Sequence, residues 1–137
     1  MSVERPTVQT KVVIPSKLNH VHGIRDLIER TADQVGFPPQ EVQRIVTAAF
    51  EAIVNAVTHG SPHGGDNTIR VDVRAYSDRL VVEITDQGRG LKDFQPKEMP
   101  DTTSRGGRGV PLMRALVDEV EFSGENGGKV TLTMYRD

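Results

Sequence analysis

Two helical segments followed directly by a strand hairpin constrain the fold of this 137-residue chain more than any other feature. Apolar residues recur at helical spacing from Leu18 to Val35 and again from Pro38 to Gly60, which predicts two amphipathic helices. Two alternating segments follow, 68–76 and 80–85, and Ser77-Asp78 between them is typical of a tight turn. Strands joined by so short a turn pair antiparallel.

Further elements are expected on both sides of this centre. The pattern predicts a first strand over Val8–Ile14, a third helix over Pro111–Asp118 and a final hairpin over 120–123 and 130–135. This order predicts an α+β fold, a two-layer α/β sandwich with a mixed, mostly antiparallel sheet covered on one face by helices. Residues 88–108 show no period, and long irregular segments inside compact domains are often active-site lids.

The composition is that of a globular protein, and its length suits one domain, residues 1–137. A formal net charge of −2 gives no general attraction to nucleic acid or anionic membrane. The absence of cysteine excludes disulfides, thiolate chemistry and cysteine-ligated zinc. Because the N-terminus has no apolar run like that of a signal peptide, a cytoplasmic protein is expected.

The second predicted helix carries three polar residues at regular spacing. Glu51, Asn55 and His59 stand at i, i+4 and i+8 and share one face, between small or apolar neighbours. A buried carboxylate beside a buried amide is costly unless it serves a purpose. The amide oxygen suits a hard cation, and the carboxylate could polarise a nearby hydroxyl. The alternative is a solvated polar stripe that continues back through Arg44.

An acid and two glycines follow the strand predicted at 80–85. Asp86 could accept a hydrogen bond from an exocyclic amine such as that of adenine. Gly88 and Gly90 would let the backbone approach a flat base closely. The alternative is an ordinary turn, since Asp and Gly are common turn residues.

A second glycine-rich segment leads into the third predicted helix. Gly106, Gly107 and Gly109 stand where free N–H groups and the positive end of the helix would attract an anion. Arg105 and Arg108 would add charge-assisted contacts to phosphate. A flexible loop before an ordinary helix is the alternative. The P-loop and dinucleotide-binding motifs are both absent.

In this order, the three segments resemble the ATP-binding boxes of the histidine kinase-like (GHKL) ATPase superfamily, which includes DNA gyrase B subunits and sensor histidine kinases. The closer resemblance is to the bacterial anti-sigma factor serine/threonine-protein kinases of the RsbW and SpoIIAB type. The segments that carry it are Glu51-x-x-x-Asn55-Ala56-x-x-His59-Gly60, Asp86-x-Gly88-x-Gly90 and Arg105-Gly-Gly-Arg-Gly109.

The resemblance implies ATP and Mg²⁺ as cofactors and a role for each matching residue. Asn55 would ligate Mg²⁺, Glu51 would be the general base, and Asp86 would hold the adenine amine. Arg105 would stabilise charge on the transferring phosphoryl group. The implied ATP-binding set is Asn55, His59, Asp86, Gly88, Gly90, Gly106, Gly107, Arg108, Gly109 and Val110.

The implied function is an ATP-dependent serine/threonine-protein kinase that is also an anti-sigma factor. It would phosphorylate an anti-sigma factor antagonist, a STAS-type protein, and sequester a sigma factor, with a homodimer expected. One alternative is a nucleotide-binding module that binds a partner without kinase activity, although Glu51 favours a kinase. A histidine kinase would also need a phosphoacceptor hairpin, and the ending of the first box disfavours a switch-protein kinase.

One departure from the family concerns the last strand. The family often carries a threonine directly after the glycine that opens this strand, where it supports the adenine-binding acid through water. Gly128 or Lys129 stands at this position. Thr131 and Thr133 are expected on the face opposite Gly128, so no threonine is expected beside Asp86.

Overall fold

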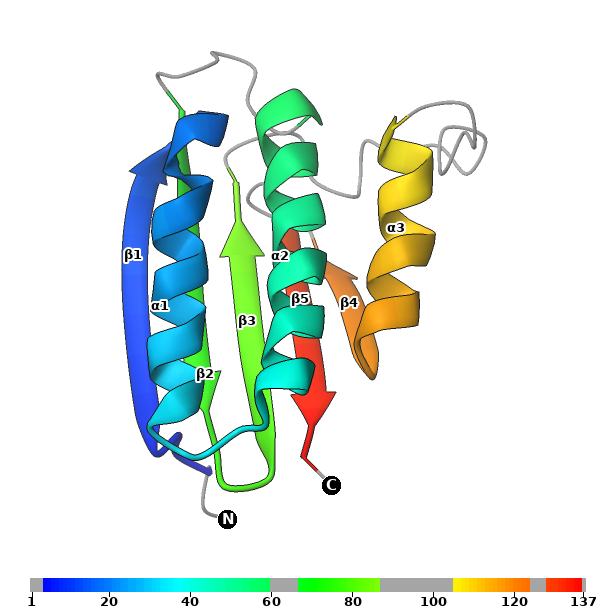
Figure 1. Cartoon of the computed structure of the whole chain (residues 1–137). Helices are drawn as coiled ribbons and strands as arrows, with labels where there is room; N and C mark the ends of the chain where they lie inside the picture. Colours follow the sequence, from blue (N-terminus) through cyan, green and yellow to red (C-terminus); the bar gives the residue numbers. More distant parts are fainter. Residues whose placement is uncertain (1–3, 60–66, 87–104, 124–127, 137) are drawn as a thin grey trace.

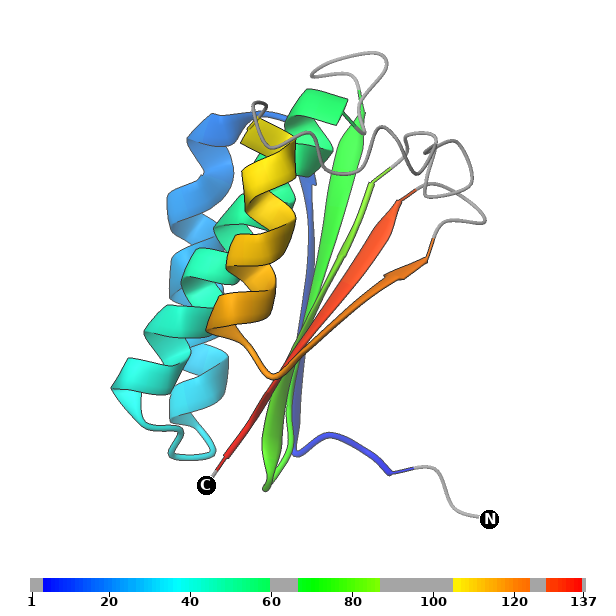
Figure 2. The ribbon, with the colours of Figure 1, turned by 90° about the vertical axis from the view of Figure 1, so that its right-hand side faces the viewer.

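The fold comes from a computed structural model, which describes residues 4–59, 67–86, 105–123 and 128–136. Within these residues, helices cover one face of a five-stranded sheet, as Figures 1 and 2 show. This confirms the predicted two-layer α+β architecture. The elements are β1 (Val8–Pro15), the 3-10 turn η1 (Leu18–His20), α1 (Val21–Asp33), α2 (Pro39–His59), β2 (Thr68–Ala75), β3 (Arg79–Thr85), α3 (Arg105–Leu116), β4 (Glu119–Ser123) and β5 (Lys129–Tyr135).

The sheet has the strand order β1-β2-β3-β5-β4, and each of its neighbouring pairs is antiparallel. The expectation of a mixed sheet was therefore wrong in this detail. The connection from β3 through α3 to β4 does join two strands that run in the same direction. However, β5 inserts between them, so no parallel pair forms among the described strands.

The core lies between the sheet and the helices. On β2, the predicted inward residues Ile69, Val71 and Val73 are completely buried. Ile28 of α1 and Ile53 of α2 meet this face and are equally buried. Each such side chain contributes roughly 1.5–3 kcal/mol through the hydrophobic effect, so this shared interface fixes which face of each helix points inward.

The junction between α1 and α2 follows the sequence prediction. Gly36 adopts a left-handed φ of 73° just past α1. The N–H of Gly36 donates to the carbonyl of Asp33 and that of Phe37 to Ala32, which together form a Schellman motif. Two residues later Pro39 opens α2, where its missing N–H and fixed φ are well tolerated.

The third helix begins six residues earlier than predicted. The glycines at 106, 107 and 109 were expected to form a loop before a helix that starts at Pro111. Instead α3 starts at Arg105, and Pro111 lies inside the helix. The prediction followed the low helix propensity of Gly and Pro. Propensity is a weak local preference, and here the six additional residues continue the helix whose Met113 is completely buried in the core.

The face of the sheet opposite the helices carries a ladder of polar contacts. Arg74 bridges Asp72 and Glu83, each at 3.2 Å, and the side-chain amide of Gln9 donates to Asp72. Lys129 extends the ladder to Glu83 at 3.4 Å. Partial burial opposes the charge on Arg74, but the hydrogen bond from its guanidinium to Glu83 and the charge of Asp72 outweigh this and raise its pKa. The ladder keeps this face polar.

Candidate functional site

Four elements meet at one end of the molecule. α2 ends there at His59, β3 ends at Thr85, α3 begins at Arg105, and β5 begins at Lys129. Both ribbon views place these four element ends on the same side of the fold (Figures 1 and 2). The fold thus brings the described parts of the three segments that the sequence singled out, the end of α2, Asp86 and the start of α3, to one end of the sheet.

The polar residues of α2 keep their helical spacing in the structure, since the helix runs unbroken from Pro39 to His59. Glu51 and Asn55 are one helical turn apart on the same face. Both side chains are partly buried, while Ala52 and Ile53 beside them are buried in the core.

The hydrogen bonding of the side-chain oxygen of Asn55 is unusual for a buried polar atom. Oδ1 of Asn55 is buried and has no hydrogen-bond partner among the described residues. A buried acceptor left without a donor costs about 1–3 kcal/mol, so proteins rarely retain one without a function. An amide oxygen is a ligand that Mg²⁺ accepts, and Asn55 therefore fits the role of a metal ligand. The purely solvated stripe that was the alternative does not describe this residue.

Asp86 is held at the end of β3 by the first residue before β5. The N–H of Asp86 donates to the carbonyl of Gly128 at 2.8 Å, and the N–H of Gly128 donates to Oδ1 of Asp86 at 2.9 Å. The hydrogen bond from the N–H of Gly128 fixes the orientation of the carboxylate. Asp86 is thus presented as an oriented acceptor at the common edge.

Gly128 has no room for a side chain. A Cβ added there would lie 2.8 Å from Oδ2 and 3.1 Å from Oδ1 of Asp86. The glycine is therefore required by the close approach of the Asp86 carboxylate.

The departure from the family motif is explained by this arrangement. Lys129 lies on the opposite face of the sheet, where its ammonium pairs with Glu83, and Thr131 is the register partner of Glu83. Neither residue shares the face of Gly128, as the strand period predicted. The backbone N–H of Gly128 contacts the Asp86 carboxylate directly.

The helical start at Arg105 changes which amides could bind an anion. The N–H groups of the first helical turn have no partner within the helix, and Gly106 and Gly107 lie in this turn. Gly109 and Val110 follow in the second turn. Within the described backbone, the amides of Arg105, Gly106 and Gly107 are therefore the ones available for phosphate.

Some predicted site residues lie outside the described part of the chain, and for others the structure describes only the backbone. Gly88 and Gly90 lie outside the described residues, as do residues 88–104 of the lid expected over 88–108. Residues 105–108 belong to α3 instead of an irregular lid. The backbone of His59 ends α2, and that of Arg105 and Arg108 belongs to α3, while the side chains of these three residues lie outside the description.

The sequence did not predict a role in this region for two residues, Gly128 and Arg44. Gly128 was noted only as a departure from the family, although its position just before the last strand could have suggested a close backbone approach. The alternative interpretation placed Arg44 on a solvated stripe, and its side chain is exposed in the structure. In the structure its Nη2 donates to the carbonyl of Ala115 on α3 at 3.0 Å.

Within the described part of the chain, no three His, Cys, Asp or Glu side chains gather as a protein-only metal cluster would require. No described helix has the length and apolar character needed to cross a membrane.

The comparisons with known proteins agree with this geometry. Residues 14–134 match the model of the histidine kinase-like ATPase domain family. The chain is 34% identical over 134 residues to the serine-protein kinase RsbW of Bacillus pumilus, a match that covers 89% of this chain and 82% of the relative. It is 28% identical to the serine-protein kinase RsbW of Bacillus subtilis over 131 residues, again with 89% and 82% covered.

Solved structures show the same fold. The RsbU and RsbW domains of Rv1364c from Mycobacterium tuberculosis superpose with a TM-score of 0.66 at 20% identity, covering 96% of this chain and 33% of that one. The histidine kinase domain of the blue-light activated kinase EL346 from Erythrobacter litoralis gives a TM-score of 0.55 at 21% identity, covering 88% and 61%.

Proposed function

Because the chain belongs to the histidine kinase-like ATPase domain family, among the relatives of the RsbW serine-protein kinases, we propose that it is an ATP-dependent serine/threonine-protein kinase. We propose further that it is an anti-sigma factor, which phosphorylates an anti-sigma factor antagonist of the STAS type and sequesters a sigma factor. The observation that carries the proposal is the buried Oδ1 of Asn55, one turn after Glu51, which has no hydrogen-bond partner among the described residues.

Asp86 supports the nucleotide part of this proposal. Its carboxylate is oriented by the N–H of Gly128 at the end of β3. In the proposed complex it accepts a hydrogen bond from the exocyclic amine of adenine, and Gly88 and Gly90 shape the pocket for the base.

The phosphate part rests on α2 and α3. Asn55 would hold Mg²⁺, which when bound neutralises charge on the phosphates. The free N–H groups of the first turn of α3, including those of Gly106 and Gly107, would bind phosphate oxygens together with the side chains of Arg108 and His59. Gly109 and Val110 of the next turn would line the site without donating their amides.

Glu51 would act on the protein substrate. Its carboxylate accepts the proton of a serine or threonine hydroxyl as the hydroxyl oxygen forms a bond to the γ-phosphorus of ATP. The bond between this phosphorus and the bridging oxygen breaks, and its electron pair leaves with ADP. Arg105 stabilises the charge on the transferring group.

A calorimetric titration with ATP, with and without Mg²⁺, tests the nucleotide site. The wild-type protein should bind ATP in a Mg²⁺-dependent manner, and Asn55→Ala should lose this dependence. The matched control is Asn19→Ala, which makes the same substitution at an exposed position in η1 and should bind as wild type does. No detectable binding by the wild-type protein would overturn the proposal.

The partner proteins need a separate test. Co-purification of the chain with a sigma factor, and release of that sigma factor by an unphosphorylated STAS-type antagonist, would support the anti-sigma role. We also propose a homodimer in the cytoplasm, which sedimentation and fractionation can check. Transfer of labelled phosphate from ATP to the antagonist is the decisive evidence for a kinase, and its absence favours a binding module.

A further inference from the structure

α2 and α3 lie side by side and run in opposite directions, as both ribbon views show. Met113 in α3 and Val117 directly after it are buried and pack the C-terminal half of the helix against the core. The same half of the helix carries one polar contact to α2, the 3.0 Å hydrogen bond from Nη2 of Arg44 to the carbonyl of Ala115. The C-terminal half of α3 is therefore fixed by both apolar and polar contacts.

The carbonyl of Ala115 has no donor within its own helix and lies at an exposed position, as Arg44 does. α3 ends at Leu116, and the last carbonyls of a helix have no partner within it. The chain then turns into β4, and the N–H of Asp118 donates to the carbonyl of Thr133 on β5. The Arg44 guanidinium supplies the donor, and its positive charge also suits the negative end of the helix dipole.

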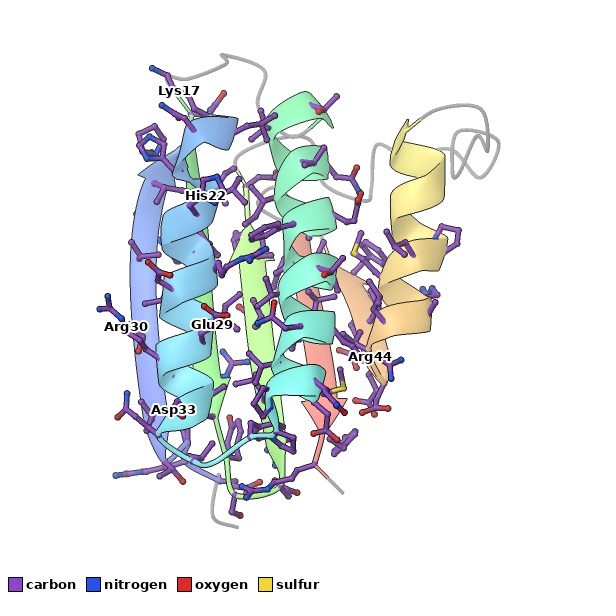
Figure 3. The ribbon with its side chains drawn as sticks, viewed as in Figure 1. Lys17, His22, Glu29, Arg30, Asp33 and Arg44 are labelled. Atoms are coloured by element: carbon purple, nitrogen blue, oxygen red, sulfur yellow. The ribbon has the colours of Figure 1, made fainter. Side chains whose placement is uncertain are left out.

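Arg44 lies on the same stripe of α2 as the proposed catalytic pair. It precedes Glu51 by seven residues and Asn55 by eleven, and both separations return to nearly the same face of an α-helix. Figure 3 shows Arg44 on the lower half of α2, on the side toward α3. One stripe of α2 thus contacts the C-terminal turn of α3 below and carries Asn55 above.

The distance along α2 from Arg44 to Asn55 is close to the distance along α3 from Ala115 back to Gly106. Eleven residues of α2 from Arg44 to Asn55 span about 16 Å, and the nine residues of α3 from Gly106 to Ala115 span about 14 Å. Because α3 is antiparallel to α2, a helix held at Ala115 places its first turn near the level of Asn55.

We propose that Arg44 is a positioning residue for ATP binding. By holding the carbonyl of Ala115, it sets where the first turn of α3, with the amides of Gly106 and Gly107, stands relative to Asn55. This inference rests on the proposed function, in which that turn binds phosphate. Arg44 itself contacts neither the nucleotide nor the reacting atoms.

Affinities for ATP and for adenosine together test this role. Adenosine depends on the Asp86 pocket alone, whereas ATP also needs the first turn of α3. We expect Arg44→Met to weaken ATP binding about fivefold, the factor expected for one hydrogen bond, and to leave adenosine binding unchanged. Arg44→Lys keeps a donor and should restore part of the ATP affinity.

The matched control is Arg30→Met, which removes an exposed arginine from the side of α1 away from α2 (Figure 3). It should bind both ligands as wild type does. Unchanged ATP affinity in Arg44→Met, or an equal loss for ATP and adenosine, would overturn the inference.

Hydrogen exchange of the nucleotide-free protein separates this inference from the proposed function. Arg44→Met should exchange the amides of α3 faster than the wild type and Arg30→Met do, while those of α1 stay unchanged. If the wild-type protein binds no ATP, the proposed function fails, and with it the role of Arg44 in nucleotide binding. Faster exchange in α3 would then still establish the tether itself, and unchanged exchange would exclude it.

Discussion

Asp86 and Gly128 hold each other through two hydrogen bonds across the gap between β3 and β5. One joins the N–H of Asp86 to the carbonyl of Gly128 at 2.8 Å, and the other joins the N–H of Gly128 to Oδ1 of Asp86 at 2.9 Å. The pair continues the β3–β5 ladder by one step beyond Thr85 and Lys129. The position of the proposed adenine acceptor is therefore set by the backbone of a neighbouring strand.

Gly128→Ala should weaken ATP binding by about tenfold, since losing a hydrogen bond to a charged group costs about 1.5 kcal/mol or more. The added Cβ would lie 2.8 Å from Oδ2 of Asp86 and would displace the carboxylate. Calorimetric titration with ATP measures the effect. Gly23→Ala is the control, because nothing lies within 4 Å of a Cβ there. Wild-type affinity in Gly128→Ala would show that Asp86 does not need this position to bind nucleotide.

Asn55→Ala should stabilise the nucleotide-free protein while removing its Mg²⁺-dependent ATP binding. The substitution removes a buried acceptor without a described partner and introduces a better helix former. We expect a gain of about 1 kcal/mol in the free energy of unfolding, measured by urea denaturation. A loss of stability would instead indicate that Asn55 is retained for structural reasons.

Glu51→Gln should separate catalysis from binding. Replacing a general base lowers the turnover rate roughly 100-fold or more, whereas ATP affinity should stay near that of the wild type. The measurement is phosphate transfer to a STAS-type antagonist alongside an ATP titration. Glu121→Gln, at an exposed position on β4, is the matched control. Transfer at the wild-type rate by Glu51→Gln would exclude Glu51 as the base.

Gly36→Ala should lower the free energy of unfolding by about 1–2 kcal/mol, because an alanine is strained at a left-handed φ. Gly36 has a φ of 73°, and an added Cβ would lie at an ordinary 3.4 Å from Nη2 of Arg136, so the cost comes from the backbone. Thermal unfolding measures it. Gly36→Asn should cost less, since Asn tolerates this conformation better. Equal stability of Gly36→Ala and the wild type would contradict the assigned turn.

The local elements could be predicted from the sequence because their signals lie within a few residues. The helical stripe of α2 placed Glu51 and Asn55 on one face, and the glycine at 36 marked the end of the helix before it. α3 shows the limit of such signals. Gly106, Gly107 and Gly109 indicate a loop through their low helix propensity, yet in the structure they belong to the same helix as Met113, whose burial in the core is a tertiary contact.

The sequence by itself determined the periods of the helices and strands, the turn at Ser77-Asp78 and the residue types gathered for nucleotide chemistry. Only the tertiary structure decided that β5 enters between β3 and β4, that Gly128 holds Asp86, and that Arg44 reaches Ala115. The physical reason is the separation along the chain of the residues that interact. Periodicity and turn chemistry act between neighbours in the chain, whereas these contacts join residues 42 and 71 positions apart and form when the sheet and its helices pack together.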